Sequence, residues 1–492
     1  MKKYIFYFLF SLICASTTAQ GQPEFDLVLS GGRVMDPETG LDAIRNVGIS
    51  GDKIAAISTG ALRGKRIIDV TGKVVSPGFI DLHVHGVSNT EQEYQLHDGL
   101  TTALELEWGV GPLKAWYAQR KSNALINYGA SVCWPYERFR ALEKFMEQAE
   151  QLKESSRLEP YTLINTIKQI TPSYTEVPDD SEMRQTLKNI EESLQAGGIG
   201  IGIPIGYLPQ TNPTELYEVY KMAGRSGALL FTHVRTPDMS GLQEAFSNAI
   251  LTRAPLHIVH LNSMALGNIE LALNMLEDAT SQGHRITSEV YPYTAASTAL
   301  ESAMFDPGWQ QRLGMSYEDL QWVATGERLN KDTYEAYRKK GGVVIMHMMQ
   351  PEWIKTGLRA EGIAVASDGM MYAPLAHPRT AGTFTRVLGK YVREDQALDL
   401  MTALKKMTLI PARILEDIAP AMSQKGRLQE GADADITVFD PATVSDQATF
   451  EGGLEFSKGV TYVLVGGVLV LDQGNTVPNL YPGQPIYGKF RE

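Results

Sequence analysis

The sequence predicts an α/β fold, a (β/α)₈ barrel of the TIM type joined to a small composite β-sandwich domain formed by the N- and C-terminal segments. Two patterns support this prediction. Between about residues 76 and 424, short apolar runs alternate with amphipathic helical stretches, as in parallel sheets whose strands are buried on both faces. Outside that region, short alternating runs are broken by turn residues, which is typical of small antiparallel strands.

Eight apolar runs qualify as barrel strands, and eight strand and helix units in about 350 residues suit such a barrel with insertions. A ninth run, residues 343–349, is interpreted as accessory. The 133–190 stretch and the segment from about 309 to 340 are the expected insertions, forming lids or walls. The eight runs are PGFIDLHVH (77–85), TTALELE (101–107), NYGASVC (127–133), GIGIGIPIG (198–206), ALLFTHV (228–234), PLHIVHL (255–261), RITSEVY (285–291) and GIAVASD (362–368).

The chain divides into three expected parts. Residues 1–20 have the order of a cleavable secretory signal peptide: Lys2 and Lys3, an apolar run too short to span a bilayer, then small residues. Residues 21–75 and 425–492 are assigned to the β-sandwich, and residues 76–424 to the barrel. We therefore expect an exported, periplasmic protein.

Two cysteines bear on this expectation. A lipid anchor on Cys14 is not expected, because Ile13 stands where a small residue is usual. Removal of the signal peptide leaves Cys133 as the only thiol, so the mature protein folds without an internal disulfide.

Composition limits the classes of partner. The 43% apolar and 21% charged residues exclude a disordered or fibrous chain. A net charge of −12 excludes a broad electrostatic footprint for nucleic acid or anionic lipid. No transmembrane segment is expected, and the oligomeric state stays open. An acidic ligand must be held by local positive groups.

Polar residues collect where the predicted strands end, which is where catalytic groups stand in barrels of this type. Residues two apart in a strand point to the same face, so the histidine pair of the first strand can share one metal, and the glutamate pair of the second strand shares a face likewise. The residues are His83, His85, Glu105, Glu107, His233, His260 and Asp368.

This set predicts a metal site. Burying an unpaired carboxylate costs several kcal/mol, so carboxylates and imidazoles that converge on one rim need a shared cation. Imidazole and carboxylate ligands without thiolate suit Zn²⁺ best, with one or two ions per chain. The other residues of these types are interpreted as structural or solvated, with His347 left open: His97, His257, His284 and, as a packing residue, Cys133.

Several longer motifs resemble those of the amidohydrolase superfamily, and within it the N-acyl-D-amino-acid deacylase (D-aminoacylase) family, which includes D-glutamate deacylases. The resemblance covers nearly the whole mature chain. It implies a metal-dependent hydrolase that cleaves the amide bond of N-acyl-D-amino acids, and the D-stereochemistry comes from the resemblance alone. The motifs are PGFIDLHVHG, GLTTALELEWG, THVR, HLN, YPYTAAST, ASDGM, HPRTAGTFTRVLGKYVRE and KGRLQEGADADITVFDP.

The resemblance also implies roles for the rim residues. His83, His85 and Asp368 match the more exposed metal site of the family, and His233 and His260 match the more buried one.

The bridging ligand departs from the family pattern. Trp108 stands where many deacylases have Cys, and the fourth strand lacks the Lys of other branches. Glu107 is the best anionic substitute, Glu105 is the alternative one layer deeper, and a third possibility is that both only pair with basic residues. Asn262 replaces a Lys that many relatives carry, which would change side-chain preference.

The mechanistic hypothesis is amide hydrolysis. The metal lowers the pKa of a water, Asp368 takes its proton and later protonates the leaving amine, and Tyr207 joins the metal in stabilising the oxyanion. Arg379 would bind the substrate carboxylate bidentately, helped by Tyr291 and Ser297. The alternative for Arg379 is an ion pair that pins a loop.

Two rival functions stay open. A cyclic amidase or lactonase would use the same hydroxide, although the missing strand-four Lys counts against hydantoinase-like relatives. A non-catalytic metal-binding or ligand-binding protein of the envelope would not need Asp368 as a proton shuttle beside the metal.

Overall fold

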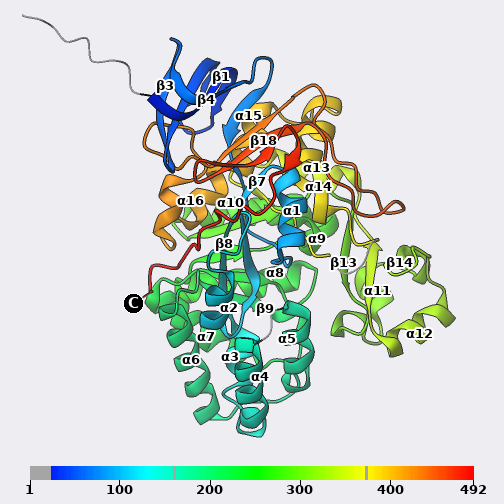
Figure 1. Ribbon diagram of the computed structural model, residues 1–492. Helices are drawn as coiled ribbons and strands as arrows, with labels where there is room; N and C mark the ends of the chain where they lie inside the picture. Colours follow the sequence, from blue (N-terminus) through cyan, green and yellow to red (C-terminus); the bar gives the residue numbers. More distant parts are fainter. Residues whose placement is uncertain (1–23, 159–161, 372–374, 492) are drawn as a thin grey trace, which may run out of the picture.

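The computed structural model describes residues 24–158, 162–371 and 375–491, so the predicted signal peptide lies outside the described residues (Figure 1). Eight parallel strands form one sheet in chain order, and a bridge between Val84 and Gly369 links its two edges. The predicted (β/α)₈ barrel is confirmed. Its strands are β6 (Phe79–Asp81), β7 (Leu100–Val110), β8 (Asn127–Cys133), β9 (Ile201–Pro204), β10 (Leu230–His233), β11 (Leu256–Ile258), β12 (Ile286–Val290) and β16 (Ala364–Val365).

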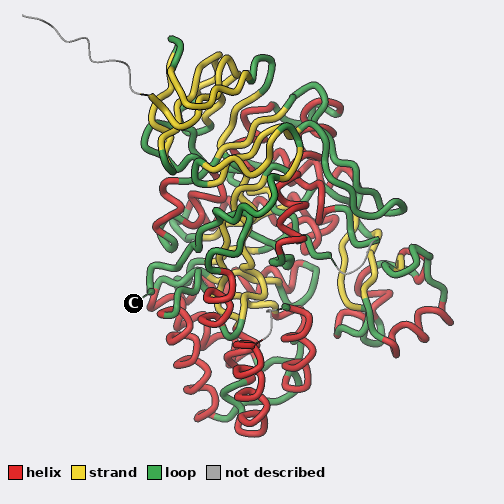
Figure 2. Tube along the Cα trace, in the orientation of Figure 1, coloured by secondary structure: helices red, strands yellow, loops and turns green. Residues whose placement is uncertain are grey.

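Helices follow the strands and surround the sheet (Figure 2). Their ends follow local sequence rules: Asp179 and Glu182 form a capping box at the start of α6, and α7 begins with Pro213 and ends at Gly227 in the left-handed conformation. These helices include α1 (Asn89–His97), α2 (Leu113–Arg120), α6 (Asp180–Gln195), α7 (Pro213–Ser226), α8 (Met239–Thr252), α9 (Leu261–Ala265), α10 (Ile269–Ser281), α13 (Pro351–Arg359), α14 (Arg379–Arg386), α15 (Leu400–Met407) and α16 (Leu409–Leu415).

The two ends of the chain meet in a nine-stranded sheet, as predicted for the composite domain. The ends join where β5 pairs antiparallel with β17. The sheet branches at β1, because the N-terminal part of β1 pairs with β4 and the C-terminal part with β5. The strands are β1 (Glu24–Asp36), β2 (Leu41–Ser50), β3 (Lys53–Ser58), β4 (Arg63–Asp69), β5 (Val74–Pro77), β17 (Ile436–Phe439), β18 (Val460–Val465), β19 (Val468–Asp472) and β20 (Asn475–Thr476).

The last segment of the chain departs from the predicted division. Residues 483–489 leave the nine-stranded sheet and lie along the barrel, where the backbone N–H of Ile486 donates to Tyr128 O (2.7 Å) and that of Lys489 to Ile418 O (2.7 Å). The segment lies there because it satisfies the backbone of β8: the N–H of Tyr128 in turn donates to Gln484 O (3.1 Å).

Two insertions extend from the barrel (Figure 1). The first, between β8 and β9, holds α3 (Trp134–Phe139), α4 (Met146–Leu158) and α5 (Leu163–Ile170). The second, between β12 and β16, holds α11 (Trp309–Leu313), α12 (Lys331–Lys340) and a three-stranded sheet of β13 (Ala295–Ala299), β14 (Leu320–Trp322) and β15 (Val343–His347). The run 343–349 is therefore accessory, as predicted. Within the described part of the chain, no helix is both long and apolar enough to cross a membrane.

Candidate metal and active site

Strand β7 is distorted where its glutamates stand. The pairing with β8 runs from Glu105 opposite Ala130 to Val110 opposite Val132, so residues 106–109 bulge out of the ladder. Gly109 permits the bulge: its φ is +69°, and a Cβ there would lie 2.6 Å from Ser131 O. The bulge carries the Glu107 carboxylate to the rim of the barrel.

Two groups of ligand-type atoms meet at this rim. Within each group all atoms lie within 4.8 Å of one another, and both groups include Glu107. One group comes from the ends of β6, β7 and β16, and the other from β7, β10 and β11. The groups are His83, His85, Glu107 and Asp368, and Glu107, His233 and His260.

Glu107 faces both groups. Its Oε2 lies 3.1 Å from His83 Nε2 and 2.9 Å from His85 Nε2. Its Oε1 lies 3.5 Å from His260 Nε2, is buried, and accepts no hydrogen bond from the described residues. The alternative candidate, Glu105, instead accepts a hydrogen bond from His85 Nδ1 at 2.8 Å. The geometry therefore favours Glu107 as the bridging group. Glu105 instead orients the ring of His85.

The contacts of the two histidine rings are those expected around a cation. His83 Nδ1 donates to Glu289 Oε1 (2.6 Å), as His85 Nδ1 does to Glu105. A neutral ring that donates through Nδ1 presents a lone pair at Nε2, and these two Nε2 atoms face each other at 3.3 Å beside Glu107 Oε2. Such lone pairs repel unless a positive ion lies between them, so the donor set fits a metal ion.

The electrostatic field of the site also favours positive charge. Burial opposes a charge on His83, yet the surrounding carboxylates, Asp368 first among them, raise the pKa of His83 to about 10. At His233 burial outweighs the attraction of the Glu107 carboxylate and lowers the pKa to about 4, so its ring is neutral. Its Nδ1 donates to Val234 O at 2.9 Å, which leaves the Nε2 lone pair for a metal.

Two rim residues have backbone conformations that side chains rarely adopt. His260 has φ +33° and Asp368 has φ +53°. The N–H of Asp368 donates to His83 O at 2.7 Å, so the end of β6 holds the strained turn in place. Such strain persists where the surroundings impose it and is concentrated at functional sites.

The catalytic candidate Asp368 connects the ligand group to the substrate-binding candidates. Its Oδ1 lies 3.3 Å from His85 Nε2, and its Oδ2 lies 2.9 Å from Arg379 Nη2. Arg379 begins α14, is 4% exposed, and stacks over the Tyr291 ring at 4.8 Å. Both predicted roles of Arg379 are therefore compatible with its position. It makes an ion pair with Asp368, and it lines the cavity described next.

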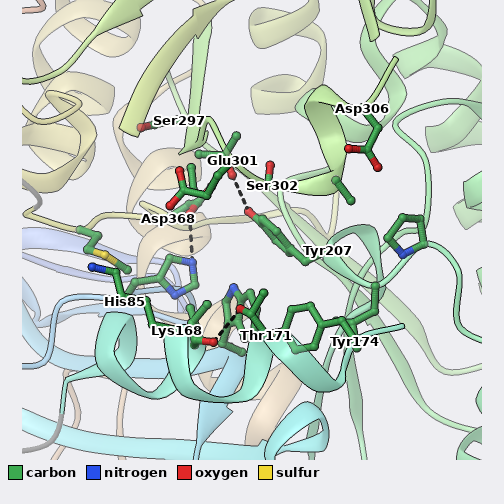
Figure 3. A pocket seen from close by; sticks show the side chains of 18 of the residues that line it. His85, Lys168, Thr171, Tyr174, Tyr207, Ser297, Glu301, Ser302, Asp306 and Asp368 are labelled. Atoms are coloured by element: carbon green, nitrogen blue, oxygen red, sulfur yellow. Dashed lines mark hydrogen bonds and ion pairs between the residues drawn. The ribbon is translucent and has the colours of Figure 1, made fainter. Parts of the chain in front are cut away.

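A cavity of about 450 Å³ opens above the rim, between the two insertions. The predicted Tyr207 and Ser297 line it, whereas Tyr291 lies outside the lining, because its buried ring supports Arg379 from beneath. Figure 3 shows Thr171 and Tyr174 of the first insertion on one side and Glu301 and Ser302 of the second on the other, with His85 and Asp368 at the inner end.

The comparisons with known proteins agree with this arrangement. A model of the amidohydrolase family matches residues 272–471. An N-acyl-D-glutamate deacylase from Alcaligenes xylosoxydans xylosoxydans is 29% identical over 94% of this chain and 96% of its own length. A D-aminoacylase from the same organism is 29% identical over 92% and 95%. The chain is thus similar over nearly its whole length to D-aminoacylases and related deacylases, and its C-terminal part matches the amidohydrolase family.

Solved structures show the same fold. An N-acyl-D-glutamate deacylase from Bordetella bronchiseptica, complexed with zinc and a phosphonate inhibitor, gives a TM-score of 0.79 at 24% identity, with 94% of this chain and all of that one covered. A D-aminoacylase solved to study its binuclear metal centre gives 0.76 at 25% identity, with 94% and 100% covered. A D-hydantoinase is more distant, at 0.59 and 16% identity.

Sequence reasoning missed one important residue of this site. Glu289 on β12 accepts from His83 with Oε1 and lies 3.1 Å from His257 Nε2 with Oε2. His257, predicted to be structural, is thus linked to a ligand candidate through one carboxylate. The argument that a buried glutamate needs a partner, applied to Glu105 and Glu107, would have found Glu289 in RITSEVY.

His97, His284, His347 and Cys133 belong to neither ligand group. His97 stacks on Phe456 at 3.9 Å, His284 lies between α10 and β12, and His347 lies 3.0 Å from Gln321 Oε1 within the second insertion. Cys133 ends β8 and is buried. Asn262, at the start of α9, donates to Tyr291 O at 3.2 Å and therefore supports the backbone below Arg379.

Proposed function

We propose that this amidohydrolase is a zinc-dependent deacylase that cleaves the amide bond of N-acyl-D-amino acids to a carboxylate and a free amino acid. The observation that carries the proposal is the pair of ligand groups sharing Glu107, placed beside the Asp368–Arg379 ion pair at the inner end of the cavity. The zinc-complexed deacylase to which the chain is similar supports the choice of metal and substrate.

The residues present fit one or two zinc ions. His83, His85, Glu107 and Asp368 would hold an ion at the exposed position, and Glu107, His233 and His260 one at the deeper position. Zinc in such a site supplies Lewis acidity toward water and the acyl carbonyl.

The protein's own residues perform the remaining steps. Arg379 holds the carboxylate of the amino-acid half, which orients the scissile amide over the rim. Asp368 accepts a proton from the attacking water and transfers it to the leaving nitrogen. Tyr207, which also lines the cavity, would donate to the oxyanion.

The test is hydrolysis by the zinc-loaded protein of paired N-acetyl-D- and N-acetyl-L-amino acids, with hydantoins and lactones as comparison substrates and released amine or acid as the readout. We expect turnover of the D series, and loss of turnover after chelation with recovery on adding zinc. Hydrolysis of the cyclic substrates alone would replace the proposal with the cyclic amidase or lactonase function.

We also propose that the protein is exported and processed near Ala19, on the order of charged, apolar and small residues at its N-terminus. The intact mass of the protein recovered from the periplasm of its native host tests this. Retention of Met1 in the cytoplasm would contradict it.

A further inference from the structure

We propose that the acyl group of the substrate is apolar and larger than acetyl, and that it lies against one wall of the cavity formed by Trp108, Ile167, Tyr174 and Tyr207, here called the apolar wall. This inference rests on the proposed deacylase function and deepens it, because it assigns the acyl half of the substrate to a place in the cavity.

The apolar wall is built from three separate elements. Trp108 follows Glu107 in the bulge of β7, Ile167 belongs to α5 with Tyr174 just beyond, and Tyr207 follows β9. The rings of Trp108 and Tyr207 lie 5.1 Å apart, tilted by 44°. Trp108 packs with Leu163 of α5 in one buried cluster, which the other members of the wall join. The first insertion thus brings apolar side chains to the cavity.

The wall is left partly uncovered by the protein. Ile167, Tyr174 and Tyr207 are only half-buried and line the cavity, whereas Leu163 and Ile170 on the same helix α5 are buried. An apolar surface in a concave site gains about 25 cal/mol for each Å² that a ligand removes from water. An apolar ligand group would therefore bind against this wall.

The position of Arg379 decides which half of the substrate reaches the wall. Arg379 and Asp368 follow β16, whereas Trp108 lies in β7 and Tyr207 follows Pro204 of β9, which lies across the ring from β16 in the strand order. A planar trans amide projects its two substituents in opposite directions. When Arg379 holds the carboxylate of the amino-acid half, the acyl carbon chain points toward the apolar wall.

The size of the cavity indicates more than an acetyl group. A volume of about 450 Å³ lies within the range of about 300–1,000 Å³ that accommodates drug-sized ligands. The lining also includes polar side chains, among them Lys168, Gln210 and Glu301, which limits the apolar surface available. We therefore expect acyl groups of about four to eight carbons, or one aromatic ring.

The first experiment compares kcat/KM of the zinc-loaded protein for one D-amino acid carrying acetyl, butanoyl, hexanoyl or phenylacetyl groups. Each buried methylene is worth roughly four-fold, so partial burial predicts a hexanoyl substrate at least about ten-fold better than the acetyl one. If no N-acyl amino acid is hydrolysed, the proposed function itself fails. If the acetyl substrate is hydrolysed best, the proposed function stands and this inference is wrong.

The second experiment uses two matched variants on α5. Ile167→Ala removes apolar surface from the cavity, whereas Ile164→Ala removes the same atoms from a residue that packs on the cluster but does not line the cavity. We expect Ile167→Ala to lower the hexanoyl-to-acetyl ratio of kcat/KM at least about five-fold, with zinc content retained in both variants. Equal effects of the two variants on that ratio would overturn the assignment.

Discussion

The rim of the barrel and the two insertions differ in how they are built. At the rim, the side chains come from strand ends, His83 and Glu107 are 0% and 1% exposed, and the rings of His83, His85 and His233 are oriented by a further carboxylate or carbonyl. The insertions contribute helices and a small sheet whose inner faces line the cavity and whose other faces meet solvent. We therefore expect the chemistry to depend on the rim of the barrel, and substrate choice to depend on the insertions. Changes at the rim should affect every substrate, and changes in the insertions should affect particular ones.

The largest effect is expected at Glu107. Glu107→Gln keeps the shape of the side chain and removes the charge that both ligand groups share, so zinc occupancy should fall and kcat/KM should drop roughly 1,000-fold or more, equivalent to about 4 kcal/mol. Zinc per chain, activity and circular dichroism measure this.

The control is Glu105→Gln. If Glu107→Gln retains metal and activity while Glu105→Gln loses both, the ligand is Glu105. If neither change affects zinc content or activity, neither glutamate bridges the ligand groups, and both only pair with basic residues in the barrel.

The next effect concerns Arg379, which belongs to the rim but faces the substrate. Arg379→Met should lower kcat/KM for free carboxylates by about 30-fold to 1,000-fold, since a charge-assisted pair is worth on the order of 2 to 4 kcal/mol. Arg379 also contacts Asp368, so the substitution can lower activity without any effect on carboxylate binding. Methyl-ester substrates, which lack the carboxylate, measure that part of the loss in kcat/KM. An equal loss on acids and esters would restrict Arg379 to the ion pair with Asp368.

A smaller effect is expected from the carboxylates behind the ligands. Glu289→Gln and Glu105→Gln should each lower zinc affinity or turnover by about 10-fold to 100-fold, because they set the tautomers of His83 and His85. Zinc titration of the apoprotein measures this. An unchanged zinc affinity in both variants would show that the tautomers are imposed by other contacts.

The smallest effect on chemistry is expected from the insertion. Buried Arg138 of α3 pairs with Glu215 (2.7 Å) and donates to Ser173 O (2.7 Å), which ties the first insertion to α7. Arg138→Met should destabilise this region by about 3–5 kcal/mol, because it leaves Glu215 buried and unpaired. Hydrogen exchange should rise in residues 162–178, with zinc content retained.

The matched surface control is Lys144→Met, whose ion pair with Glu176 is largely exposed and should contribute about 0–1 kcal/mol. If Arg138→Met also removes zinc, the rim and the insertion are not independent.

Much of the fold and of the candidate site was predictable from local patterns. The eight barrel strands and the accessory run followed from apolar runs between helical stretches, and the ligand candidates His83, His85 and Asp368 followed from their positions at strand ends. The geometry also favours Glu107 over Glu105. Glu289 was not foreseen, and Tyr291 was expected to help Arg379 bind the substrate and not to stack against it, because both contacts join different strands and helices.

The sequence by itself determined which residues stand at strand ends, because strand periodicity and burial are local properties of the chain. Only the tertiary structure decided how they are used. The bulge at residues 106–109 turns Glu107 toward both ligand groups, and the path of the first insertion brings Ile167 beside Trp108. Such pairings depend on the register between strands and on the packing of distant segments, in which many weak contacts act together and no single residue pattern records the result.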